Sequence, residues 1–154
     1  MSKIENNASS KTIKLIIFDW DGTISDSVAR IVSSMQSAAT ELDMAVPTYL
    51  EVKEIIGLGL TEAAFRLFPQ ATREQVFQLQ TSYSQHYRTE DSAPCPFFLG
   101  VEETLHQLKA DGYQLAVATG KSRAGLDRVL LSLAWKIFST VVAVPMKPFP
   151  SLIR

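Results

Sequence analysis

Two carboxylates one residue apart, Asp19 and Asp21, are the strongest candidates for chemistry in this chain of 154 residues. They directly follow an apolar run that ends at Phe18, and Gly22 comes next. Two carboxylates this close cannot both stay ionised comfortably unless a cation neutralises them or one of them holds a proton. Both solutions suit phosphoryl transfer, with Asp19 as the nucleophile beside Mg²⁺ and Asp21 as the acid and base.

A second apolar run, residues 115–118, ends in Thr119, Gly120 and Lys121. The Thr119 hydroxyl can donate to a phosphoryl oxygen, and a helix that begins near Ser122 would direct its free N–H groups to the same place. Lys121 would add positive charge. A lone Thr-Gly after a strand usually marks a turn, but its pairing with the two aspartates favours phosphate binding.

The elements that must position these residues change type along the chain. Residues 13–18 are typical of a strand that is buried on both faces of a parallel sheet. From Val28 the apolar residues recur at helical spacing, and further amphipathic stretches cover 49–56 and 61–68. A longer stretch places Val76, Leu79, Tyr83 and Tyr87 on one face. We therefore expect residues 28–91 to be helical.

Two prolines within residues 92–96 indicate a linker, because proline resists both helix and strand. A short helix ending at Asp111-Gly112, the strand 115–118 and a helix carrying Leu126 follow. The fold class predicted is α/β, with a Rossmann-like parallel sheet interrupted by an all-helical module. Ligands of such sheets bind at the carboxyl ends of the strands, where both candidate segments lie.

Composition excludes several classes of function. Hydrophobic residues make up 46% of the chain and charged residues 20%, which is typical of a folded, soluble protein. A net charge of -1 without a basic cluster argues against nucleic-acid and membrane partners. Cys95 is the sole cysteine and the start is not signal-like, so we expect a cytoplasmic protein without an intrachain disulfide.

These motifs resemble the haloacid dehalogenase-like hydrolase superfamily, and within it the phosphoglycolate-phosphatase-like group with a helical cap. The resemblance covers about residues 13–138 and is most specific at its first motif. It is carried by Phe18-Asp19-Trp20-Asp21-Gly22-Thr23, by Asp26-Ser27, by Gly100-Val101 and by residues 115–121.

The resemblance implies a Mg²⁺-dependent phosphatase of a small phosphorylated metabolite, in which Asp19 forms an aspartyl-phosphate and Asp21 is the acid/base. Magnesium is expected on the Asp19 side chain and the Asp21 backbone carbonyl. Residues 28–91 become a lid over the site, in which Gly57-Leu58-Gly59 is either a turn that faces the substrate or only a flexible connector. The phosphate-binding residues expected are Gly22, Thr23, Thr119, Gly120 and Lys121.

The chain departs from the family's pattern after its second motif. The family has a later Lys and a later acidic pair that completes the metal site, whereas this sequence has no Asp or Glu after Asp127. Codons available to residues 142–154, read one nucleotide earlier, can encode the family's Lys-bearing segment, so we do not assign that role to Lys147. Our hypothesis is a frameshift near Val141 and a truncated, unstable and impaired copy with an incomplete sheet.

The expected organisation is a disordered tail at 1–11, an α/β core at 12–27 and 97–140, a helical cap with its linker at 28–96, and an aberrant tail at 141–154. Alternatives to the phosphatase stay open. A phosphomutase would pass the aspartyl-phosphate to a second substrate, and a non-catalytic remnant would bind phosphate or a partner. A receiver domain fits the α/β core but not the helical insertion. Residue types give no indication of the oligomeric state.

Overall fold

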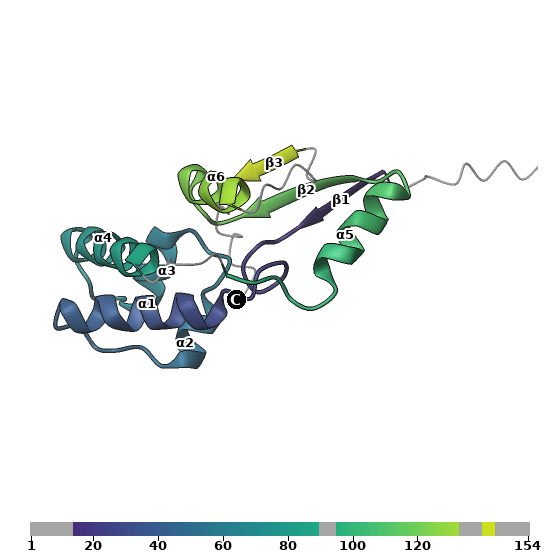
Figure 1. The fold of residues 1–154 in the computed structure, drawn as a ribbon. Coiled ribbons are helices and arrows are strands. Elements are labelled where there is room, and N and C mark those ends of the chain that lie inside the picture. Colours follow the sequence, from purple (N-terminus) through teal and green to yellow (C-terminus); the bar gives the residue numbers. More distant parts are fainter. Residues whose placement is uncertain (1–13, 90–94, 133–139, 144–154) are drawn as a thin grey trace, which may run out of the picture.

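The computed structural model describes residues 14–89, 95–132 and 140–143 (Figure 1). The expected tail at 1–11, most of the linker at 92–96 and residues 144–154 lie outside the described residues. Side chains are described up to Leu130.

Three parallel strands form the sheet in the order β1-β2-β3. They are β1 (Leu15–Phe18), β2 (Gln114–Thr119) and β3 (Thr140–Ala143). In register, Phe18 pairs with Val117, and Thr119 pairs with Ala143. Residues 141–143, the start of the segment expected to be aberrant, therefore lie in the sheet. The parallel α/β class predicted from the sequence is confirmed.

The prediction that β1 is buried on both faces is wrong. Ile16 and Phe18 pack against the core, but the alternate residues Leu15 and Ile17 are 47% and 59% exposed. Successive side chains of a strand point to opposite faces, and the described helices cover only one face of β1. A continuous apolar run does not distinguish burial on two faces from burial on one, and the face that carries Leu15 and Ile17 is exposed.

Two helices pack on the sheet, α5 (Val101–Ala110) and α6 (Arg123–Ser132). Their fully buried residues Leu105 and Leu126 join Leu115 and Val117 of β2 in one apolar cluster. Ser122 caps α6, because its hydroxyl accepts a hydrogen bond from the Gly125 N–H at 3.2 Å. The helix predicted to start near Ser122 is thereby confirmed.

The inserted module is all-helical, as predicted, and has a hydrophobic core of its own. It contains α1 (Val28–Glu41), α2 (Tyr49–Glu54), α3 (Leu60–Leu67) and α4 (Arg73–Thr89). Helices α1 and α4 pack side by side around the buried Met35 and Leu79. We call residues 28–89 the cap and the sheet with α5 and α6 the core.

The two connections between cap and core are hydrogen-bonded to each other. The Asp26 N–H donates to the Pro96 carbonyl at 2.8 Å, and the Phe98 N–H donates to the Ile24 carbonyl at 3.2 Å. All three strands point their carboxyl ends toward the cap (Figure 1). Within the described part of the chain, no helix combines the length and hydropathy needed to cross a bilayer.

Candidate active site

A tight turn anchored by Trp20 holds the two aspartates at the end of β1. The Trp20 carbonyl accepts hydrogen bonds from the backbone N–H groups of Thr23, Ile24 and Ser25, at 3.0 to 3.3 Å. Its side chain is 1% exposed and meets Phe97 edge to face, with ring centroids 6.0 Å apart. The buried indole therefore fixes the backbone between the two carboxylates.

Asp19 lies on the solvent side of this turn. One of its carboxylate oxygens accepts a hydrogen bond from the Trp20 N–H at 2.7 Å. Partial burial and the nearby charge of Asp21 raise the pKa of Asp19, although the Trp20 N–H and the Lys121 charge oppose the rise. The main cause of the rise is lost hydration, and a cation beside this carboxylate would oppose it, because a nearby positive charge favours the ionised form.

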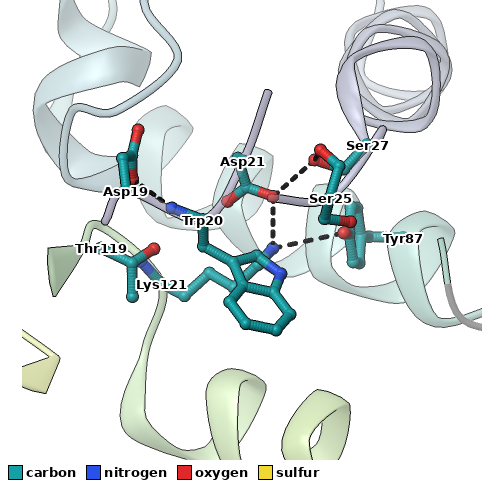
Figure 2. A network of polar contacts seen from close by, with 8 residues as sticks. All are labelled: Asp19, Trp20, Asp21, Ser25, Ser27, Tyr87, Thr119 and Lys121. Atoms are coloured by element: carbon teal, nitrogen blue, oxygen red, sulfur yellow. Dashed lines mark hydrogen bonds and ion pairs between the residues drawn. The ribbon is translucent and has the colours of Figure 1, made fainter. Parts of the chain in front are cut away.

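Asp21 is held by two partners, which Figure 2 shows. The fully buried Ser27 donates its hydroxyl to Asp21 Oδ1 at 2.6 Å, and Lys121 Nζ lies 2.9 Å from the same oxygen. Both charged side chains of this ion pair are only 13% exposed. Solvent screening is therefore weak here, and the pair holds Asp21 in one orientation.

Lys121 also joins the core to the cap. Its Nζ donates to the Tyr87 hydroxyl at 3.3 Å and lies 4.9 Å from the centroid of the Tyr87 ring. Tyr87 comes from the last turns of α4, so a cap residue reaches the aspartates through Lys121 (Figure 2). Reasoning from the sequence placed Tyr87 only on an apolar helix face and missed this contact.

The second strand delivers Thr119 beside the aspartates. Phe18 and Val117 are partners in the parallel register, so the residues after each strand lie at the same edge of the sheet. Thr119 is 2% exposed, and its Oγ1 accepts the Lys121 N–H at 3.2 Å. Within the described part of the chain this hydroxyl donates to no other residue, so its hydrogen is available to an acceptor such as a phosphate oxygen.

Gly120 meets the turn of the cap formed by residues 57–59. A Cβ atom on Gly120 would lie 2.8 Å from the Leu58 carbonyl oxygen and 3.1 Å from that of Gly57. The 2.8 Å contact is closer than real Cβ atoms come to backbone, so a larger residue at this position would displace the backbone. The cap turn therefore rests directly on the loop after β2, rather than lying away from the site as a plain connector.

Gly22 and Thr23 take part mainly through the backbone. Gly22 has a φ of 75°, a conformation that favours glycine, and its N–H donates to the Ser25 carbonyl at 2.9 Å. The Thr23 N–H is used within the same turn, and the Thr23 side chain is exposed. Their expected phosphate contacts stay predictions.

The donors at the edge of the sheet suit a hard cation. Mg²⁺ prefers oxygen ligands, is usually bound through one or two carboxylates, and completes its octahedron with waters and substrate phosphate. The Asp19 carboxylate and the Asp21 carbonyl provide such oxygens. Among the described residues, no group of three or more acidic, His or Cys side chains gathers to hold a metal without that help.

The loops at the carboxyl ends of β1 and β2 bring four functional groups together. They are the accessible carboxylate of Asp19, the ion-paired carboxylate of Asp21, the Thr119 hydroxyl and the Lys121 ammonium group. A carboxylate nucleophile requires neutralisation of an incoming anion, and Lys121 provides a positive charge next to it. Ser27 is the residue whose direct contact with Asp21 the sequence analysis did not assign. Two signals were available for it, its place just before the first cap helix and its membership of the Asp26-Ser27 pair that carries part of the resemblance.

The chain is similar to known proteins over most of its length. The model of the family described as haloacid dehalogenase-like hydrolase matches residues 16–154. A Dickeya dadantii protein named Probable phosphatase IndB is 34% identical over 146 residues, covering 90% of this chain and 64% of that protein. A phosphoglycolate phosphatase from Agrobacterium fabrum is 34% identical over 118 residues, covering 70% of this chain and 48% of that protein.

Solved structures share the same fold. The crystal structure of a predicted phosphoglycolate phosphatase from Haemophilus somnus has a TM-score of 0.73 and 26% identity, covering 84% of this chain and 62% of that one. The chain spans about half to two thirds of the length of these relatives. With the family match joined to the paired aspartates at the end of β1, the chain belongs to the haloacid dehalogenase-like hydrolases.

Proposed function

We propose that the site hydrolyses a small phosphate monoester with Mg²⁺, through an aspartyl-phosphate on Asp19. One observation carries the proposal. Asp19 faces solvent while Asp21, two residues further, is fixed by Ser27 and Lys121 at the same edge of the sheet. The two carboxylates therefore have different surroundings, which suits different roles as nucleophile and acid/base group.

In the first step a carboxylate oxygen of Asp19 attacks the phosphorus atom, and the bond between phosphorus and the ester oxygen breaks. Asp21, in its protonated form, donates its proton to the leaving oxygen. For this, Lys121 must leave the Asp21 carboxylate, and the incoming phosphate dianion competes for its ammonium group. The Thr119 hydroxyl donates to a second phosphate oxygen.

In the second step Asp21 takes a proton from water, and that water attacks the phosphorus atom. The bond to Asp19 breaks, which releases inorganic phosphate and restores both carboxyl groups. Mg²⁺, held by the Asp19 carboxylate and the Asp21 carbonyl, would supply neutralisation of the phosphate charge. The cap, whose turn touches Gly120, limits the access of bulk water to this reaction.

The substrate proposed is a small, phosphoglycolate-like ester. The name of the Agrobacterium relative, together with the cap turn resting on the phosphate-binding loop, supports a compact substrate. We also propose that turnover by this chain is low. No third acidic ligand from the described residues joins Asp19 and Asp21, and electrostatic stabilisation is usually the largest catalytic term.

The test measures phosphate release from 2-phosphoglycolate and from an aryl phosphate, with Mg²⁺ and with chelator. We expect release that requires Mg²⁺ and falls by more than about a thousandfold in Asp19→Asn, because a nucleophile cannot be replaced by an amide. Asp26→Asn is the matched control, since Asp26 is an exposed carboxylate of the same loop. Equal rates for wild type and Asp19→Asn would refute the proposal. Phosphate transferred to an added sugar phosphate instead of water would favour a mutase.

A further inference from the structure

Tyr87 is a cap side chain that contacts a charged group of the site, the Lys121 ammonium. Its hydroxyl accepts a hydrogen bond from Lys121 Nζ at 3.3 Å, and its ring centroid lies 4.9 Å from the same nitrogen. An ammonium group at this distance from an aromatic centroid is attracted by the ring's quadrupole. The attraction to the ring is the less directional of the two contacts, since any nitrogen position over the face retains it.

The surroundings of Tyr87 keep the ring in place and its hydroxyl neutral. Burial raises the pKa of Tyr87 far above its ordinary value, so the hydroxyl stays protonated and uncharged. Tyr83, one turn earlier on α4, packs against it with ring centroids 5.8 Å apart. The Arg30 guanidinium lies 5.9 Å from the Tyr87 centroid, so a second cation faces the same ring.

We propose that Tyr87 is a positioning residue, which holds the Lys121 ammonium at the phosphate site and does so only while the cap is docked on the core. The inference rests on the proposed function, because it assigns Lys121 to the substrate phosphate. It makes a cap helix part of the phosphate site without contact between Tyr87 and the phosphate itself.

The physical basis is preorganisation of a flexible side chain. A lysine has four rotatable side-chain bonds, and ordering them opposes binding. In the site without phosphate, the contacts with Asp21 and Tyr87 together hold the Lys121 side chain in one conformation. When phosphate enters, Lys121 exchanges the Asp21 oxygen for a phosphate oxygen, while the ring still lies beside the ammonium group. The Lys121 side chain therefore loses less conformational entropy when phosphate binds.

The experiment measures the affinity of the full chain for inorganic phosphate with Mg²⁺, by titration calorimetry. We expect Tyr87→Leu to weaken binding about fivefold, which corresponds to about 1 kcal/mol. Tyr87→Phe keeps the ring face and should remain within about twofold of wild type. Tyr83→Phe is the matched control on the same helix, and we expect no change. Tyr87→Met replaces the Leu variant if that variant does not fold.

A double-mutant cycle separates positioning from a merely structural role. In the Lys121→Met background, where no ammonium remains to be positioned, Tyr87→Leu should cause no further loss of phosphate affinity. The same loss in both backgrounds, or no loss in the wild-type background, would overturn the inference. If the wild type binds no phosphate, both the proposed function and the inference are overturned. This result differs from the two outcomes above, in which the wild type binds phosphate and only the effect of Tyr87→Leu disagrees. If wild type turns over, KM should rise in Tyr87→Leu while kcat stays within about twofold.

Discussion

Gly120→Ala tests the contact between the cap turn and the loop after β2. The added Cβ would lie 2.8 Å from the Leu58 carbonyl oxygen, 3.1 Å from the Gly57 oxygen and 3.3 Å from the Leu58 carbonyl carbon. All three atoms belong to the backbone, so no side-chain rotation relieves the clash. Either the cap turn or the loop with Thr119 must therefore shift.

The magnitude follows from overpacking. An extra methyl group forced into a close-packed contact costs about 1–3 kcal/mol. The free energy of unfolding, measured by urea denaturation, should fall by this amount, with a lower urea midpoint and an unchanged m-value. Phosphate affinity should fall as well, because the displaced loop carries Thr119 and Lys121 and because a lifted cap withdraws Tyr87 from Lys121.

The matched control is Gly59→Ala in the cap turn itself. A Cβ there meets no heavy atom within 4 Å, and the φ of -62° suits alanine. We expect stability within about 1 kcal/mol of wild type and unchanged phosphate affinity, because alanine restricts the unfolded chain but replaces the glycine at the N-cap of α3. The reasoning is refuted if Gly120→Ala unfolds at the wild-type urea concentration and binds phosphate with wild-type affinity.

Three further predictions concern the cap and its linker. Ser34→Ala should raise the free energy of unfolding by about 0.5–1 kcal/mol and so raise the thermal midpoint, because the buried Ser34 hydroxyl has no hydrogen-bond partner among the described residues. A lower midpoint would contradict this. Burial raises the pKa of the Cys95 thiol, so its alkylation at pH 8 should be slower in the folded chain than in urea and should accelerate above pH 9. Equal alkylation rates in the folded and urea-unfolded chain would contradict this. Hydrogen bonds from Thr48 lower the pKa of Glu51, so this group favours the folded chain above pH about 4.5 and loses that effect as pH falls through its folded pKa. The fall of the urea midpoint below pH 4.5 should therefore be shallower in Glu51→Gln, and an unchanged profile would exclude the assigned contact.

The sequence was sufficient for the parallel α/β class and for the helical insertion. Apolar spacing at Val28 and beyond identified helices whose stripes are buried in the cap's own cluster, which includes Ile31, Val32 and Met35. Such patterns depend on residues close together in the chain, where helical and strand periods are distinct. The exposed face of β1, with Leu15 and Ile17, could not be predicted, because an apolar run does not show which faces other elements cover.

The site was predictable as two strand ends but not as a network. Asp19, Asp21 and Thr119 follow apolar runs, and the edge rule for parallel sheets brings such residues together. The contact of Lys121 with Tyr87 joins residues 34 positions apart across the seam between cap and core. No local period encodes such a contact, and only the docking of the cap creates it.

The central claim is that Asp19 becomes phosphorylated. We would mix the chain with Mg²⁺ and 2-phosphoglycolate, quench with borohydride, which reduces an acyl phosphate to an alcohol, and map the reduced residue by mass spectrometry. The account predicts reduction at Asp19 that requires both Mg²⁺ and substrate, that is lost in Asp19→Asn and that persists in Asp26→Asn. Reduction at another carboxylate, or phosphate release from the wild type without any reduced Asp19, would contradict it.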